Sequence, residues 1–287
     1  MLLDLEDIFD KELEPLFVLL RKENATLIDQ LIRLTGGLTV RSNGKIANTV
    51  ENLKKLREIR RLFNNVVNNP QYAKQIENIK PVFDKLSTRI TAYFAKTFDL
   101  AKDYDSKAVF KFLKEDAIEQ TVSLLTNRGL GAVFSKPIEN VLKQNISGGG
   151  TIDQLTAQLK SELGKAGATN QVFLERYLGQ IAGDSVNEFS RNYINTFAED
   201  LGLEWYLYEG KAISSSRSFC EDRANRYYHR SEVESWADLK WQGKIPQTNS
   251  VTIFSFVGGY NCRHYLIPVP ESAVPEAVLA RYNKNNS

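Results

Sequence analysis

The sequence predicts a mainly α-helical N-terminal region followed by a small α+β module with short strands. Three observations predict this fold class. Apolar residues recur at three- and four-residue steps through the first 200 residues, which is the spacing of a buried helix face. After Gly202 the chain becomes aromatic and reads as short strands. All three tryptophans, both cysteines and both histidines lie after residue 200, so the two parts have different tasks.

The helical pattern divides at glycine, asparagine and proline. One helix is predicted to end at Asn68-Asn69-Pro70. The apolar residues on one of its faces are Leu53, Leu56, Ile59, Phe63 and Val66. A second helix is expected from Pro70 towards Phe98, and a third covers about Ser106 to Thr126. Gly129 and Gly131 then break the pattern, which resumes over residues 134–145.

A glycine run marks the clearest hinge or domain boundary. Ser147-Gly148-Gly149-Gly150 separates a helical region at 1–147 from a module at 151–270. Thr151 and Gln154 have capping-box spacing, which predicts the start of a helix. A long helix is expected from about Asn170 to Asp200, with Gly202 as the residue that ends it.

Three short strands are expected in the module. They cover Trp205–Tyr208, Val251–Val257 and His264–Ile267. Ser231 is placed to cap a helix that carries Trp236. The tail at 271–287 has little to pack and is expected to be flexible.

Charge and hydropathy exclude several classes. Lys plus Arg is 37 and Asp plus Glu is 35, so the net charge of +2 gives no bulk attraction to nucleic acid. No apolar run approaches the roughly 20 residues that a membrane helix needs, so no membrane association is expected. The N-terminus lacks the features of a signal peptide, which predicts a protein made and used in a cytoplasm.

Motifs of common enzymes are missing from the sequence. Gly148-Gly149-Gly150-Thr151 lacks the lysine of a P-loop, and neither Gly-x-Ser-x-Gly nor His-Glu-x-x-His occurs. Two histidines leave little room for general base chemistry, so the chain is not expected to be an enzyme. A basic run reads as a solvated helix face, with direct DNA contact as the alternative; it contains Arg41, Lys45, Lys54, Lys55, Arg57, Arg60 and Arg61.

The cysteines and histidines admit three interpretations. Cys220, Cys262 and His264, with His229 as a candidate fourth ligand, offer the nitrogen and sulfur donors of tetrahedral zinc. A Cys220–Cys262 disulfide is the second interpretation. The third is a pair of small buried groups that brace a short sheet, with no cofactor.

Arg217, Asn261 and Arg263 admit two interpretations. The first is contact with an anion or a nucleic acid. The second is that they tie loops together, because an arginine can donate several hydrogen bonds to carbonyls in a fixed fork. Asn261, after Gly-Gly-Tyr, can hold a tight turn through its own side chain.

The order of motifs after Thr151 resembles the phage Mu F-like minor head protein family (the MuF domain). In that family a long helix precedes an aromatic strand, an Arg-x-x-Cys element, a Trp-containing helix and a Gly-rich turn with Asn-Cys-Arg. The matching residues here are Arg217, Cys220, Trp236, Gly258, Gly259, Asn261, Cys262, Arg263 and His264. The resemblance covers roughly 120 residues, under half of the chain.

The resemblance implies a phage minor head protein that is located in the virion. Such a structural protein associates with the portal protein or other capsid proteins, near packaged DNA, and acts in head assembly or DNA delivery. It carries no catalytic role. Two alternatives stay open: an effector injected by the phage, and a DNA-binding accessory protein.

Overall fold

The computed structural model describes residues 5–101, 103–126, 136–164, 173–210, 213–214 and 216–286. It confirms the predicted fold class, with many helices and a three-stranded sheet near the C-terminus. Within the described residues, no helix is long and apolar enough to cross a membrane. The breaks predicted at Gly129 and Gly131 lie outside the described residues.

The chain forms two compact units. The all-helical unit consists of Glu12–Ile79 and Glu119–Ala182. The sheet-containing unit consists of Met1–Lys11, Lys80–Ile118 and Gly183–Ser287. Each unit contains segments from both sides of residues 147–151, because helices far apart in sequence pack together within it.

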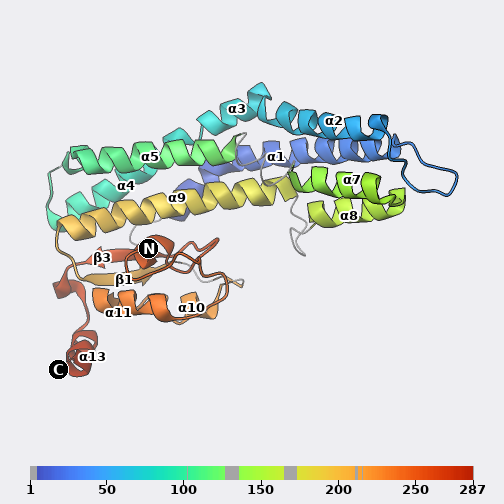
Figure 1. The fold of residues 1–287 in the computed structure, drawn as a ribbon. Coiled ribbons are helices and arrows are strands. Elements are labelled where there is room, and N and C mark those ends of the chain that lie inside the picture. Colours follow the sequence, from blue (N-terminus) through green and yellow to red (C-terminus); the bar gives the residue numbers. More distant parts are fainter. Residues whose placement is uncertain are drawn as a thin grey trace. The chain divides into compact units, whose positions relative to one another are not determined.

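The all-helical unit holds helices from both halves of the N-terminal region. Its elements are most of α1 (Leu5–Gly36) with α2 (Val50–Val67), α3 (Pro70–Glu77), α7 (Lys136–Gly148) and α8 (Ile152–Gly164). Helix α7 packs against both α2 and α8, and the pair α7 and α8 is green in Figure 1. The helix predicted from the apolar positions between Leu53 and Val66 is confirmed as α2.

The single helix predicted from Pro70 to Phe98 is wrong. The structure has α3 and then α4 (Lys80–Phe98), with the Asn78 N–H closing α3 on the carbonyls of Lys74 and Ile76. The physical reason is Pro81, which lacks an N–H and whose ring would clash with the carbonyl four residues earlier in a continuous helix.

The glycine run at 148–150 is a turn inside the all-helical unit. Gly149 has φ 64°, and the Gly150 carbonyl accepts a hydrogen bond of 2.8 Å from the Ile46 N–H. The predicted capping box is confirmed, because the Gln154 N–H donates to the Thr151 hydroxyl at 3.2 Å and the Thr151 N–H donates to the Gln154 side chain at 3.0 Å.

A buried asparagine fixes the loop between α1 and α2. Asn52 is 1% exposed, and its amide donates to the carbonyls of Thr39 (2.9 Å) and Ala47 (2.7 Å). Its carbonyl oxygen accepts the Thr39 N–H at 3.0 Å. The Asn52 side chain therefore links the backbone at Thr39 to the backbone at Ala47 within this loop.

Asn52→Ala is expected to lower the free energy of unfolding by about 3 kcal/mol, since three hydrogen bonds are lost and buried groups stay unpaired. Urea denaturation followed by circular dichroism measures the change. Asn43→Ala is the matched control, because exposed Asn43 accepts a single N–H in the same loop. Equal losses for the two variants would contradict the role of Asn52.

Aromatic stacking builds the helical part of the sheet-containing unit. The rings of Phe94 on α4 and Phe197 on α9 (Phe173–Asp200) stack at 4.2 Å. Phe110 on α5 (Ala108–Leu125) lies 4.5 Å from Phe197. The predicted helix end is confirmed, because α9 ends at Asp200 and Gly202, two residues later, has φ 62°.

An antiparallel sheet in the order β2-β1-β3 forms the centre of the module. Its strands are β1 (Trp205–Glu209), β2 (Tyr227–His229) and β3 (Tyr265–Val269). Tyr208 pairs with Leu266 across β1 and β3. Tyr206 and Tyr208 enter one hydrophobic cluster, and Trp205 and Leu207 enter another, as strand alternation requires.

The strand predicted over Val251–Val257 is wrong, because this segment is the short helix α12 (Ile253–Phe256). Polar side chains next to the apolar run override its strand propensity. The Asn249 carboxamide accepts the N–H groups of Val251 (2.9 Å) and Thr252 (3.0 Å), which starts a helical turn. The third strand of the sheet is instead β2.

The predicted helix after residue 230 is present, but Ser231 is not its cap. His229 caps helix α11 (Arg230–Ser235): its ring accepts the Ser231 N–H, while the Glu232 side chain accepts the His229 N–H. This capping box uses an imidazole in the place of the usual hydroxyl or carboxylate.

The tail that was expected to be flexible contains the turn η4 (Glu271–Ala273) and helix α13 (Glu276–Asn286). The Tyr282 ring lies 5.2 Å from Trp205 and 4.3 Å from His229. Val274 is buried in the same cluster. The tail is helical because Val278, Leu279 and Tyr282 cover the second face of β1.

Candidate functional site

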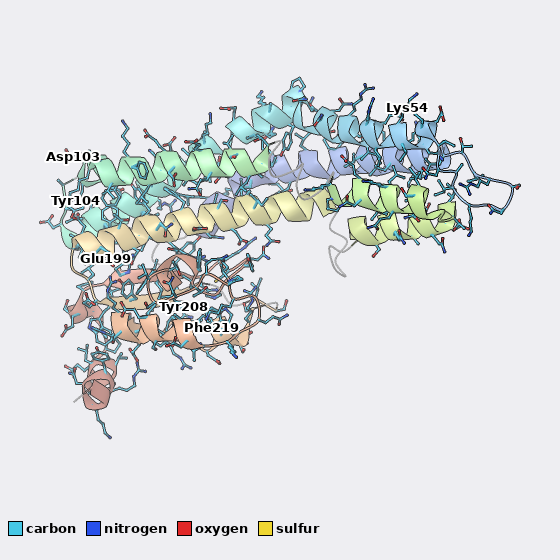
Figure 2. All side chains as sticks on the ribbon, in the orientation of Figure 1. Lys54, Asp103, Tyr104, Glu199, Tyr208 and Phe219 are labelled. Carbon is cyan, nitrogen blue, oxygen red and sulfur yellow. The ribbon has the colours of Figure 1, made fainter. Side chains whose placement is uncertain are left out.

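The sheet-containing unit brings Cys220, Cys262 and His264 together. Cys220 is on α10 (Ser218–Glu221), while Cys262 and His264 directly precede β3. One ligand atom from each lies within 4.8 Å of the other two, and all three residues are buried. Figure 1 shows α10 and α11 on one side of β1, and Figure 2 labels Tyr208 and Phe219 in this region. We call these three residues the Cys-Cys-His cluster.

The spacing within the Cys-Cys-His cluster is close to that of tetrahedral metal ligands. The two sulfurs are 4.0 Å apart, and the Cys262 Sγ is 3.8 Å from the His264 Nδ1. Zinc–sulfur and zinc–nitrogen bond lengths imply separations of about 3.8 and 3.6 Å around a tetrahedral ion. All three donors lie within 4.8 Å of one another, so the Cys220–His264 pair would close by at most about 1.2 Å around one ion. Both cysteines are free thiols in this structure.

Gly258 explains how the sulfurs can approach the backbone so closely. A Cβ on Gly258 would lie 2.5 Å from the Cys220 Sγ and 2.7 Å from the Cys262 Sγ. Glycine at this position leaves the space that the two sulfurs occupy. The backbone also supports Cys262, because the His264 N–H donates to its sulfur at 3.4 Å.

Gly259 has a separate steric role. It adopts φ +92°, and a Cβ there would lie 2.0 Å from the Gly243 carbonyl oxygen. The same oxygen accepts the Tyr260 N–H at 3.0 Å. The Gly258-Gly259 pair thus lets the segment before β3 fold back against residues 243–244.

Arg191 on α9 holds the segment that carries two members of the cluster, and sequence analysis missed it. Its guanidinium donates to the carbonyls of His264 (3.0 Å), Cys262 (2.5 Å) and Ser255 (3.2 Å). The residue is 5% exposed. An arginine within a helix normally reaches solvent, so no local pattern marks this one as buried.

The two thiols favour different protonation states. A hydrogen bond from Cys220 lowers the pKa of Cys262, aided by Arg191 and His264 against the effect of burial. The hydrogen bond to Cys262 and burial raise the pKa of Cys220. These two pKa shifts favour a thiolate at Cys262 that accepts a hydrogen bond from the Cys220 thiol. Burial and the two neighbouring cysteines also raise the pKa of Tyr208.

Two polar atoms at the cluster are buried without a hydrogen-bond partner among the described residues. They are the His264 Nε2 and the Tyr208 hydroxyl oxygen. The rings of Tyr208 and His264 lie 5.2 Å apart. Leaving such a group unpaired costs about 1–3 kcal/mol, so the cluster has unused capacity for a ligand or water.

The other motif residues surround this cluster as braces. Arg217 donates to the carbonyls of Gly258 (3.3 Å) and Tyr260 (2.6 Å), as expected for an arginine that ties loops together. Asn261 adopts φ 56°, and its N–H donates to the Asp184 carboxylate at 2.7 Å. Arg263 is exposed.

Aromatic packing completes the wall around the cluster. The Trp236 ring lies 5.8 Å from Phe219 and 5.9 Å from Tyr208. Trp241 stacks on Phe219 at 4.1 Å, and its indole N–H donates to the Gly258 carbonyl at 3.0 Å. Trp236 is therefore core rather than an exposed contact residue.

His229 does not join the cluster, which corrects its expected role as a fourth ligand. Its ring contacts the Ser231 hydroxyl at 2.9 Å and the Tyr282 hydroxyl at 2.8 Å. It lies in the cluster formed with Trp205, on the other face of β1. The strand alternation that puts Tyr208 on one face puts Trp205, the partner of His229, on the other.

Comparison of the chain with protein-family models, with curated proteins and with solved structures yields no match.

Proposed function

We propose that this chain is a phage minor head protein, located in the virion, which binds the portal protein or the inner capsid wall during head assembly or DNA delivery. The observation that supports the proposal is the convergence of the motif residues. Arg217, Cys220, Trp236, Gly258 and Cys262 all contribute to one buried core. Residues that specify a module are expected to pack in this way.

The packing of the motif residues favours a structural role over catalysis. Trp236, Cys220 and Cys262 are each at most 5% exposed. The Arg217 guanidinium donates hydrogen bonds to backbone carbonyls. A substrate would have to displace these contacts, whereas a docking protein uses them only to hold its shape.

We propose that α5 supplies a docking surface for the portal protein. Phe112 is 66% exposed and Val109 is 47% exposed, and their spacing of three residues places them on one helix face. Aromatic side chains such as that of Phe112 are enriched in protein interfaces. Both residues lie in the sheet-containing unit.

The test is co-elution in size-exclusion chromatography of the full chain with the portal protein of the same phage genome. Phe112→Ser is expected to raise the protein concentration required for co-elution at least tenfold, because the apolar anchor is lost. Val251→Ser is the matched control, since Val251 is 77% exposed outside α5. It is expected to co-elute like the unaltered chain.

Two results would count against the proposal. Separation of the unaltered chain from the portal protein at every salt concentration would contradict portal binding. Equal behaviour of Phe112→Ser and the unaltered chain would contradict the role of α5. DNA binding with a steep salt dependence would instead favour the DNA-binding accessory protein, for which exposed Lys54 and Arg57 on α2 are available (Figure 2 labels Lys54).

A further inference from the structure

We propose that Cys220, Cys262 and His264 bind a structural zinc ion, and that the Tyr208 hydroxyl contacts the ion or a water molecule bound to it. The proposal concerns the fold of the module and is independent of the proposed portal binding. It rests on the geometry of the cluster, its donor chemistry and its unpaired polar atoms.

The geometry already resembles that of a bound site. The sulfur–sulfur distance of 4.0 Å and the sulfur–nitrogen distance of 3.8 Å each exceed the tetrahedral values by about 0.2 Å. The donors come from two segments, α10 and the residues before β3. Gly258 and Arg191 shape the backbone so that both segments can supply them.

The donor set selects the ion. Two thiolates and one imidazole are soft and intermediate ligands, which zinc accepts in tetrahedral sites and which magnesium and calcium do not favour. The two buried sulfurs lie 4.0 Å apart, close enough to bind the same cation. A divalent ion neutralises both thiolates, whereas Arg191 directs its donors to backbone carbonyls.

Unpaired groups provide an independent observation. In the part of the chain that the structure describes, the buried Tyr208 hydroxyl has no partner at hydrogen-bond distance, and its ring lies 5.2 Å from that of His264. Three protein ligands leave one position of a tetrahedral ion open. A contact from Tyr208, direct or through water, would fill that position and satisfy the hydroxyl.

A disulfide is the competing fate of the two cysteines. A disulfide places its sulfurs about 2.05 Å apart, so the Cys220 and Cys262 sulfurs, now 4.0 Å apart, would have to approach by about 2 Å. The carbonyl contacts of Arg191 hold the Cys262 segment in its present place. Around zinc the sulfurs would approach by only about 0.2 Å, and this smaller change favours the ion.

The experiment measures zinc in the full chain, purified under reducing conditions and dialysed against zinc sulfate. Metal analysis is expected to find one zinc per chain. Cobalt substitution is expected to give the absorption bands of a tetrahedral thiolate site. Cys262→Ser and His264→Gln are expected to weaken zinc binding at least tenfold, and Tyr208→Phe to weaken it less.

His229→Gln is the matched control, because His229 lies outside the Cys-Cys-His cluster. It is expected to keep one zinc per chain. If the cluster variants do not fold, a chelator titration of the unaltered chain replaces them, and removal of the ion is expected to lower its Tm.

The proposal would be overturned by an unaltered chain that binds no zinc under reducing conditions, or by His264→Gln binding zinc as tightly as the unaltered chain. Peptide mapping that finds a Cys220–Cys262 disulfide in the reduced preparation would overturn it as well. Loss of portal binding with zinc retained would overturn only the proposed function.

Discussion

Gly259→Ala is expected to lower the free energy of unfolding by about 3–5 kcal/mol, within the range reserved for strained or overpacked positions. The added Cβ would lie 2.0 Å from the Gly243 carbonyl oxygen. That oxygen cannot withdraw without breaking its hydrogen bond to the Tyr260 N–H. Gly259 also has φ +92°, which an L-residue rarely adopts.

Gly202→Ala separates the steric clash of an added Cβ from the cost of a positive φ angle. Gly202 has φ +62°, and a Cβ there would meet nothing within 4 Å. Only the left-handed backbone penalty of about 1–2 kcal/mol applies at this position. Chemical denaturation of both variants gives the comparison. Similar losses would show that the close approach to Gly243 contributes little.

Arg191→Met is expected to lower the free energy of unfolding by about 3–5 kcal/mol, because breaking a buried, charge-assisted network leaves its partners unpaired. Methionine keeps much of the side-chain volume but donates nothing to the carbonyls of Ser255, Cys262 and His264. The segment before β3 would lose three of its hydrogen bonds to α9 and keep others, such as the one from the Asn261 N–H to Asp184. Thermal and urea denaturation measure the effect.

Arg191→Lys is expected to recover only part of this loss. Lysine keeps the charge but lacks the fork that reaches three carbonyls at once. Arg226→Met serves as the control for removing an arginine charge, since Arg226 is exposed in the same unit. A similar destabilisation by Arg191→Met and Arg226→Met would refute the bracing role.

Local signals in the sequence were sufficient for much of the fold. The apolar stripe around Ile59 predicts α2, and the Thr151–Gln154 capping box marks the start of α8. Gly202 marks the end of α9, and the aromatic run at Trp205 predicts β1. Each of these features depends on residues within a few positions of one another, so a short stretch of sequence is enough to predict it.

Competition between local signals explains the errors. The apolar residues around Phe254 favour a strand, but the Asn249 side chain starts a helical turn next to them. The tail after Glu271 looks weakly apolar in isolation. Its helix is explained by the exposed second face of β1, which Tyr282 covers. Neither outcome follows from hydropathy alone.

Composition by itself determined that every cysteine and histidine belongs to the C-terminal module, and hence which residues could form a metal site. Only the tertiary structure decided which of them meet. Strand alternation separates His229 from His264, and Gly258 admits the two sulfurs. Buried Arg191, on helix α9 far away in the sequence, holds the segment that carries Cys262 and His264. Contacts between residues far apart in sequence require the folded chain, because their energy comes from packing that no local pattern contains.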